Sequence, residues 1–139
     1  MRTLSHQEAT RLAEQTAAVA EAHIPYGSGL GAPASFTLAW LMAGAGIEDI
    51  RVASGSSGMG DHFWIETAQW RIDPTMRQFT HLAHRSLVEP VTEPGSFEAL
   101  KYYSVPASRE EAVREVSYGF RNAAETEAFV NEMTAAVSL

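Results

Sequence analysis

A histidine and an aspartate in the middle of the chain have the side chains needed for acid–base chemistry. They are His62 and Asp73, within the segment GDHFWIETAQWRIDPT that spans residues 60–75. An imidazole can accept or donate a proton near neutral pH, and a carboxylate beside it fixes its tautomer and stabilises its charged form. If the fold brings the two together, they are predicted to form a general acid–base dyad.

The strand pattern around these residues predicts that they meet. Alternate residues of a strand point to opposite faces. A two-residue turn at 68–69 gives one apolar and one charged cross-strand pair, Ile65 with Ile72 and Glu66 with Arg71. Both pairs are favourable, and a shift of one residue would break both. This register puts His62 and Asp73 on one face as diagonal neighbours. The plainer interpretation is a polar hairpin face that ends in an ordinary turn at 73–75.

The elements before this hairpin must position it. A capping box at residues 5–8 predicts a first helix from about residue 6 to about residue 22. The segment 24–31 contains three glycines, so we expect a loop in which the backbone turns sharply or comes close to another group. A nearly apolar run over about 33–44 predicts a buried central helix.

The rest of the chain completes an α+β pattern. Residues 50–53 alternate as in a strand, whereas 76–106 predicts long loops with a short strand or helix between them. A second capping box at 108–111 opens a helical stretch, and 123–137 predicts a C-terminal helix that either continues it or stands apart. We expect a single α+β domain over residues 1–139, with a small antiparallel sheet between N-terminal and C-terminal helices.

The composition argues against several classes of protein. Asp and Glu number 17 against 10 Lys and Arg, a net charge of −7, which argues against nucleic-acid binding and against an anionic membrane surface. The chain has no cysteine, so disulfides, thiolate metal sites and Cys nucleophiles are ruled out. The N-terminus lacks the apolar run of a signal peptide, and no stretch approaches the roughly 20 apolar residues of a membrane span. We therefore expect a cytoplasmic protein.

The hairpin resembles the His–Asp half of the transglutaminase-like superfamily, the papain-like cysteine acyltransferases and peptidases. The resemblance rests on His-x-Trp-x-Glu at 62–66, on an aromatic residue followed by Asp-Pro-Thr at 70–75, and on Gln-Phe at 78–79, which matches a small bacterial branch. It covers about residues 24–80. It implies a papain-like, transglutaminase-like fold, in which a central buried helix packs on a small antiparallel sheet. It also implies peptide cleavage, amide transfer or tailoring steps in natural-product pathways.

The resemblance also shows what this chain lacks. In the family, a Cys that opens the central helix attacks an amide carbonyl, with the His as base and the Asp orienting it. Counting back from Gly46-Ile47 puts that position at or next to Gly31, in a segment GLGAPAS where the family has Gly-Leu-Cys-Gly-Glu-Ala-Ser. Both Ser28 and Ser35 are weaker candidates for a hydroxyl nucleophile, and Ser35 is more simply a packing residue.

Three interpretations remain open. The first is an enzyme in which the His62–Asp73 dyad acts on a peptide or small-molecule substrate without a Cys nucleophile and without a cofactor. The second is a catalytically inactive relative that binds a peptide, a small molecule or a protein. In either case we expect the cleft to be lined by Tyr26, Gly31, Trp64 and Trp70. The third is a metal site that uses His81 and His84 at helical spacing, against which two surface histidines are the simpler explanation.

Overall fold

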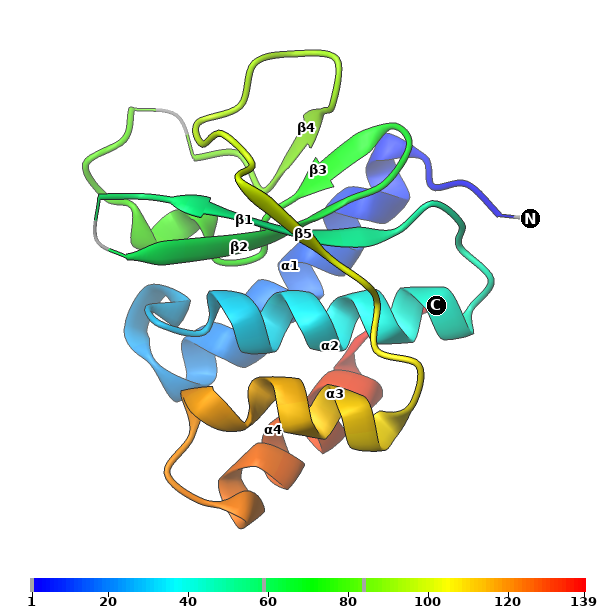
Figure 1. The fold of residues 1–139 in the computed structure, drawn as a ribbon, viewed down its shortest axis with the longest axis vertical. Coiled ribbons are helices and arrows are strands. Elements are labelled where there is room, and N and C mark those ends of the chain that lie inside the picture. Colours follow the sequence, from blue (N-terminus) through cyan, green and yellow to red (C-terminus); the bar gives the residue numbers. More distant parts are fainter. Residues whose placement is uncertain (1, 59, 84) are drawn as a thin grey trace.

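The computed structural model describes residues 2–58, 60–83 and 85–139. Over these residues the chain has four α-helices and a five-stranded antiparallel sheet, so the expected α+β class is confirmed (Figure 1). The strand order is β4-β3-β2-β1-β5. The strands are β1 (Arg51–Ser56), β2 (Asp61–Glu66), β3 (Trp70–Ile72), β4 (Val88–Pro90) and β5 (Lys101–Tyr103).

Helix α1 (His6–His23) begins at the predicted capping box. The Ser5 hydroxyl accepts a hydrogen bond from the Glu8 backbone N–H, and the Glu8 carboxylate accepts one from the Ser5 N–H, both at 3.1 Å. These contacts satisfy two N–H groups that a helix start leaves without partners. The helix buries a stripe of small and apolar side chains that includes Leu12, Ala13 and Ala17.

Helix α2 (Gly31–Gly44) is the predicted central helix, and it begins two residues earlier than expected. Pro33 lies in the first turn of this helix. A proline is tolerated throughout this turn, because the first N–H groups of a helix have no acceptor within the helix. In Figure 1, α2 runs beneath the sheet, with α3 (Arg109–Val116) and α4 (Ala123–Ala136) on its other side. This central position explains why most of its side chains are buried.

The predicted hairpin register is confirmed. Ile65 pairs with Ile72 and Glu66 pairs with Arg71 across β2 and β3. The strand predicted at 50–53 is longer, because β1 pairs with β2 along its whole length from Arg51 to Ser56. The other edge of β1 pairs with β5.

The region 76–106 contains the expected long loops together with three short elements. These are η2 (Met76–Gln78), a 3₁₀ helix, and the edge strands β4 and β5. The C-terminal helices are separate, since η3 (Ser117–Gly119) lies between them and Asn122 caps α4 by accepting a hydrogen bond from the Glu125 N–H at 2.9 Å. A further 3₁₀ turn, η1 (Pro25–Gly27), joins α1 to the loop before α2.

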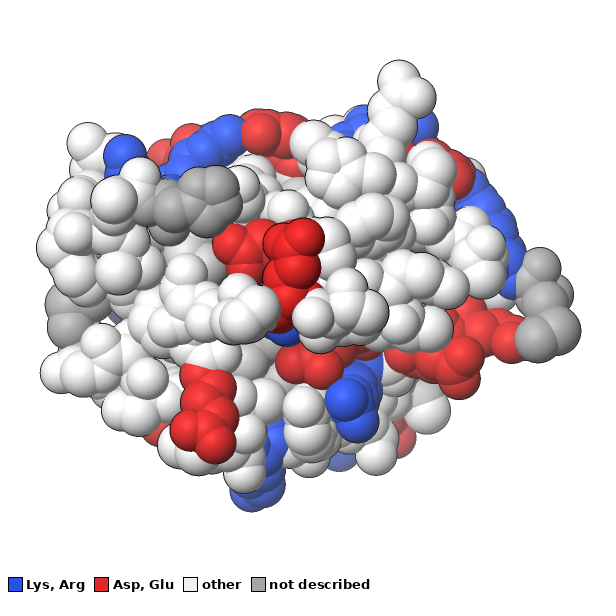
Figure 2. Space-filling model, turned by 90° about the horizontal axis from the view of Figure 1, so that it is seen from above, with Lys and Arg blue, Asp and Glu red and all other residues white. Residues whose placement is uncertain are grey.

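The charge on the sheet side of the molecule follows the acidic composition. Figure 2 shows Asp and Glu at the centre and along the right of this face, with Lys and Arg mostly near its border. None of the helices in the described part of the chain is both long enough and apolar enough to cross a membrane.

Candidate active site

The structure brings His62 and Asp73 into direct contact. His62 lies on β2 and Asp73 directly follows β3, and the His62 Nε2 atom is 2.6 Å from the Asp73 Oδ2 atom. The two residues are only 2% and 5% exposed. An ionised carboxylate can only accept a hydrogen bond, so Nε2 is the nitrogen that carries the proton. In the neutral ring, Nδ1 is then the nitrogen with a free lone pair.

The Asp73 carboxylate is held from a second side. Its Oδ1 atom accepts a hydrogen bond from the Thr75 backbone N–H at 3.3 Å, within the Asp-Pro-Thr turn. The Asp73 backbone N–H donates to the Leu87 carbonyl at 2.7 Å, which ties this turn to the segment before β4. These contacts leave the carboxylate little freedom to turn away from the imidazole.

Three aromatic side chains surround the His62 ring. The ring centroids of Phe79, Phe97 and Trp64 lie 4.6, 5.1 and 5.9 Å from that of His62. The Trp64 indole N–H donates to the Glu66 Oε2 atom at 3.1 Å, which fixes the indole beside the imidazole. This packing excludes water from the Nε2–Oδ2 hydrogen bond, and a lower local dielectric strengthens such a bond.

The free edge of the imidazole faces Gly31, the first residue of α2. A β-carbon built on Gly31 would lie 3.4 Å from the His62 Nδ1 atom and 3.4 Å from the Thr75 Oγ1 atom. Both distances are ordinary van der Waals contacts, so a side chain at residue 31 would point at the base.

A pocket of about 280 Å³ opens at this point. It lies beside the N-terminus of α2, where the first backbone hydrogen bond of the helix runs from the Ala34 N–H to the Leu30 carbonyl at 2.9 Å. The N–H groups of residues 31 and 32 thus have no acceptor within the helix and are available to a negatively charged oxygen. The pocket is lined by Ser28, Gly29, Gly31, Ala32, Ser57, Asp61, His62, Phe63, Gln78 and Phe79.

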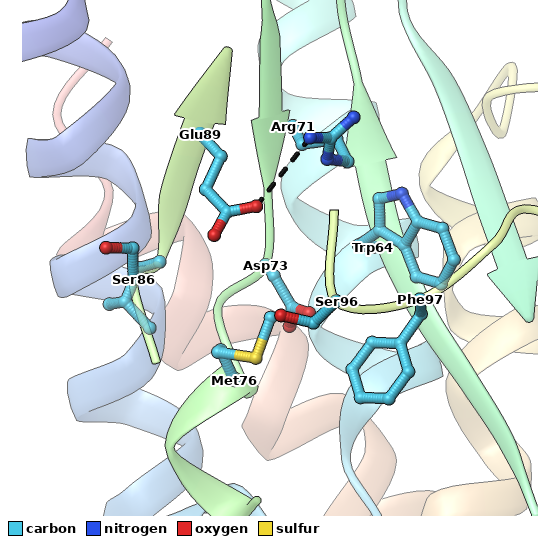
Figure 3. A pocket seen from close by; sticks show the side chains of 9 residues that line it. Trp64, Arg71, Asp73, Met76, Ser86, Glu89, Ser96 and Phe97 are labelled. Atoms are coloured by element: carbon cyan, nitrogen blue, oxygen red, sulfur yellow. Dashed lines mark ion pairs between the residues drawn. The ribbon is translucent and has the colours of Figure 1, made fainter. Parts of the chain in front are cut away.

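A second cavity, of about 10 Å³, adjoins Asp73, and its lining includes charged, aromatic, aliphatic and hydroxyl side chains (Figure 3). The Arg71 guanidinium faces Glu89 from the neighbouring strand, with Nη2 3.7 Å from the Glu89 Oε2 atom. Arg71 Nη2 also donates to the carbonyls of Pro90, at 3.1 Å, and Glu93, at 2.5 Å. Arg71 therefore fixes the start of the loop that carries Phe97 to the dyad.

The turn after Asp73 is anchored on α1 by Arg77. Its guanidinium bonds to Glu14 at 2.6 Å and to Glu21 at 3.2 Å. The hydrogen bond to Glu14 is the main reason that the pKa of Arg77 is raised above its usual range. Through this contact, η2 and the neighbouring Thr75 are held against the N-terminal helix.

The structure places the predicted cleft residues in different surroundings. Ser28 and Gly31 line the pocket, whereas Tyr26 is 56% exposed, with a backbone φ of 60°, and is not among the lining residues. Trp64 adjoins the smaller cavity instead. Ser35 is fully buried in α2, outside the pocket lining, and its hydroxyl has no hydrogen-bond partner among the described residues.

Trp70 lies away from the dyad, against the expectation that it lines the cleft. Its indole N–H donates to the Leu4 carbonyl at 2.9 Å, and its ring packs on His6 with centroids 5.0 Å apart. The reason is the pleat: Trp70 shares the Ile72 face of β3, whereas Arg71 and Asp73 share the other. Trp70 thus anchors the N-terminal segment to the sheet.

The metal interpretation gains no support from the residues that can be described. His84 lies outside them, and 81–83 form a turn and a bend rather than a helix. Within the described ranges, no group of three or more His, Asp or Glu side chains is arranged to hold a metal ion.

Sequence reasoning missed the roles of Thr75 and Phe97. Thr75 belongs to the Asp-Pro-Thr motif, and its interpretation as turn chemistry hid the fact that its hydroxyl faces the same point as His62 Nδ1. The position of Phe97 had no local signal, because the long loop that carries it is placed by contacts to Arg71.

Searches of family models, curated proteins and solved structures found no match to this chain. Its function must therefore be argued from the site itself.

Proposed function

We propose that this chain is an enzyme in which His62 acts as a general base and Asp73 orients it, without a Cys nucleophile. The observation that carries the proposal is the buried 2.6 Å contact between Nε2 and Oδ2, with Nδ1 turned toward a pocket. Asp73 fixes the tautomer and stabilises the imidazolium that forms when Nδ1 takes a proton. The substrate is a peptide or small molecule with an ester, thioester or amide group.

The position of the pocket supports acyl chemistry. A carbonyl carbon near Gly31 would lie beside the base, and its oxygen would lie near the free N–H groups at the start of α2. Such groups stabilise the negative charge that develops on a carbonyl oxygen during attack. The volume of about 280 Å³ suits a small acyl group or one or two residues of a peptide.

We further propose that the fold is of the transglutaminase-like, papain-like kind. Support comes from the position of Gly31 at the start of a central buried helix, and from His62 on β2 with Asp73 directly after the adjacent antiparallel strand β3. A Cys at residue 31 would complete the arrangement that the family resemblance implies.

A second candidate is a binding module without turnover, and the missing thiol at residue 31 favours it. The binding module was expected to have an aromatic pocket lining. It has less support because Trp70 anchors the N-terminal segment and Tyr26 is not among the pocket residues. The two candidates differ in one measurement, the rate of His62-dependent turnover.

The test uses purified protein with p-nitrophenyl acetate, an aryl thioester and an amino-acid p-nitroanilide. We expect His62→Ala to lower the rate by about 10²–10⁴-fold, the usual contribution of a positioned general base. Asp73→Asn should also lower the rate. The Asn amide N–H can donate to Nε2, which favours the tautomer in which Nδ1 carries the proton and cannot act as a base. His81→Ala is the matched control, since it removes an exposed imidazole outside the pocket.

Circular dichroism and thermal unfolding would show that each variant folds. Equal rates for wild type, His62→Ala and Asp73→Asn on all three substrates would refute the enzyme proposal. A saturable ligand complex with no turnover would favour the binding module instead.

A further inference from the structure

We propose that His62 and Thr75 hold a water molecule in the space that a side chain at residue 31 would fill, and that this water is the nucleophile. The inference rests on the proposed function and narrows it from acyl chemistry in general to hydrolysis. It also assigns Thr75 a catalytic role that its place in a turn motif does not suggest.

The acceptor in this site is His62 Nδ1. The other ring nitrogen, Nε2, is hydrogen-bonded to Asp73. In the part of the chain that the structure describes, Nδ1 has no hydrogen-bond partner. Because His62 lines the pocket, Nδ1 is the ring nitrogen that a solvent molecule can reach. A water molecule that donates to Nδ1 would give it a partner.

The donor is the Thr75 hydroxyl. Thr75 is 1% exposed, and its Oγ1 atom accepts a hydrogen bond from the Gln78 side-chain amide at 3.1 Å. That contact occupies a lone pair and leaves the hydroxyl proton without an acceptor among residues 2–58, 60–83 and 85–139. The same water can therefore donate to Nδ1 and accept from Thr75.

The two groups converge on one place. Each lies 3.4 Å from the β-carbon position of residue 31, yet no direct hydrogen bond joins Oγ1 to His62 in the described structure. A bridging molecule of the size of water suits two polar atoms that face one point without contacting each other, because Gly31 has no side chain to occupy that point. The pocket supplies the route by which water and substrate reach it.

The hydroxyl side chains nearby are not placed to act as the nucleophile. A nucleophile must lie within hydrogen-bonding reach of its base. Ser35 is buried outside the pocket lining, and neither Ser28 nor Thr75 is hydrogen-bonded to His62 in the described residues. Water is the nucleophile that needs no side chain at residue 31.

The reaction balances with water as the only co-reactant. Nδ1 takes a proton from the water as its oxygen bonds to the carbonyl carbon, and the carbonyl π electrons move to its oxygen. The tetrahedral species collapses, the bond to the leaving group breaks, and the imidazolium returns its proton to that group. The products are a carboxylic acid and the protonated leaving group, with no acyl-enzyme between them.

The first test is a high-resolution crystal structure of the wild type and of Gly31→Ala. We expect an ordered water within about 3.2 Å of both Nδ1 and Thr75 Oγ1 in the wild type. The added methyl group makes only 3.4 Å contacts, so Gly31→Ala should fold normally and displace this water. An empty site in the wild type, or a water that persists unchanged in Gly31→Ala, would overturn the inference.

The second test measures p-nitrophenyl acetate hydrolysis by Thr75→Val and Thr75→Ser. Valine keeps the shape and removes the hydroxyl, so we expect kcat to fall about 10-fold or more, corresponding to a hydrogen bond of about 1.4 kcal/mol in the transition state. Serine keeps the hydroxyl and should retain most of the rate. Full activity of Thr75→Val, or an acetyl adduct on Thr75 or Ser28 in the mass spectrum, would overturn the water mechanism.

These results separate the two proposals. If the water is present but His62→Ala retains the wild-type rate, the proposed enzyme function fails. If His62→Ala is inactive but Thr75→Val is fully active, the function stands and the inference about Thr75 and its water fails.

Discussion

Gly31→Cys gives the sharpest test of how Gly31 and His62 are arranged. The chain has no cysteine, so the introduced thiol is the only one and its reactivity can be measured without background. Its β-carbon would lie 3.4 Å from Nδ1, and the thiol would lie at the start of the 14-residue helix α2. A neighbouring imidazolium and a helix N-terminus both favour the thiolate, and such sites lower a thiol pKa from about 8.5 to between about 3.5 and 7.5.

The size of the effect follows from the thiolate fraction. With a pKa of about 6, half of the thiol is ionised at about pH 6, against roughly 0.3% for an unperturbed thiol, a ratio of about 150. A more acidic thiolate is also a weaker nucleophile, by about 10- to 20-fold over this range. Alkylation by iodoacetamide at about pH 6 should therefore be about 10-fold faster than for an ordinary thiol.

The assay is the alkylation rate of Gly31→Cys against pH, followed by intact-protein mass spectrometry. The control is the same variant with His62→Gln, which keeps the thiol and the helix but removes the imidazole. We expect the half-maximal rate near neutral pH or below in the first protein and a shift toward about 8.5 in the second. A midpoint near 8.5 in both proteins would refute the inference that residue 31 faces the base.

Two further predictions concern parts of the fold outside the pocket. Trp70→Phe should reduce the free energy of unfolding by about 1 kcal/mol, because it removes the hydrogen bond to the Leu4 carbonyl. Urea unfolding would measure this change, and a lower hydrolysis rate with unchanged stability would instead support a substrate-binding role for Trp70. The second prediction concerns Glu8, whose pKa is lowered first by the hydrogen bond from the Ser5 N–H and then by Arg2. The stabilisation that this carboxylate gives is present at neutral pH and is lost as the pH falls below the usual range of Glu toward the lowered folded pKa. Urea unfolding should therefore show Glu8→Gln less stable than wild type at about pH 7 and nearly equal to it at about pH 3, and a gap that widens on acidification would contradict this assignment.

The sequence predicted the hairpin well because two independent pairs fix its register. An apolar and a charged pair would both be lost by a slip of one residue, so few alternatives remained. The same register already places Trp70 on the face opposite His62. The expectation that Trp70 lines the cleft came from residue type alone, and alternation along the strand was the stronger guide.

The parts that could not be predicted depend on contacts between distant segments. Phe97 reaches His62 because Arg71 bonds the carbonyls of Pro90 and Glu93, and no local pattern encodes that connection. The role of Thr75 was hidden for another reason. Its backbone N–H serves the turn while its hydroxyl faces the β-carbon position of Gly31, and only the three-dimensional structure shows that the two groups point in different directions.

The buried dyad is hard to explain as a structural feature alone. Burying polar side chains carries a desolvation cost that apolar side chains of similar volume avoid, and Phe79, Phe97 and Trp64 already surround the imidazole with apolar surface. A purely structural histidine would be expected to satisfy both ring nitrogens within the protein. Here Nε2 is hydrogen-bonded to Asp73, while Nδ1 faces the pocket beside Gly31. That asymmetry is what the proposed role of His62 as a general base requires.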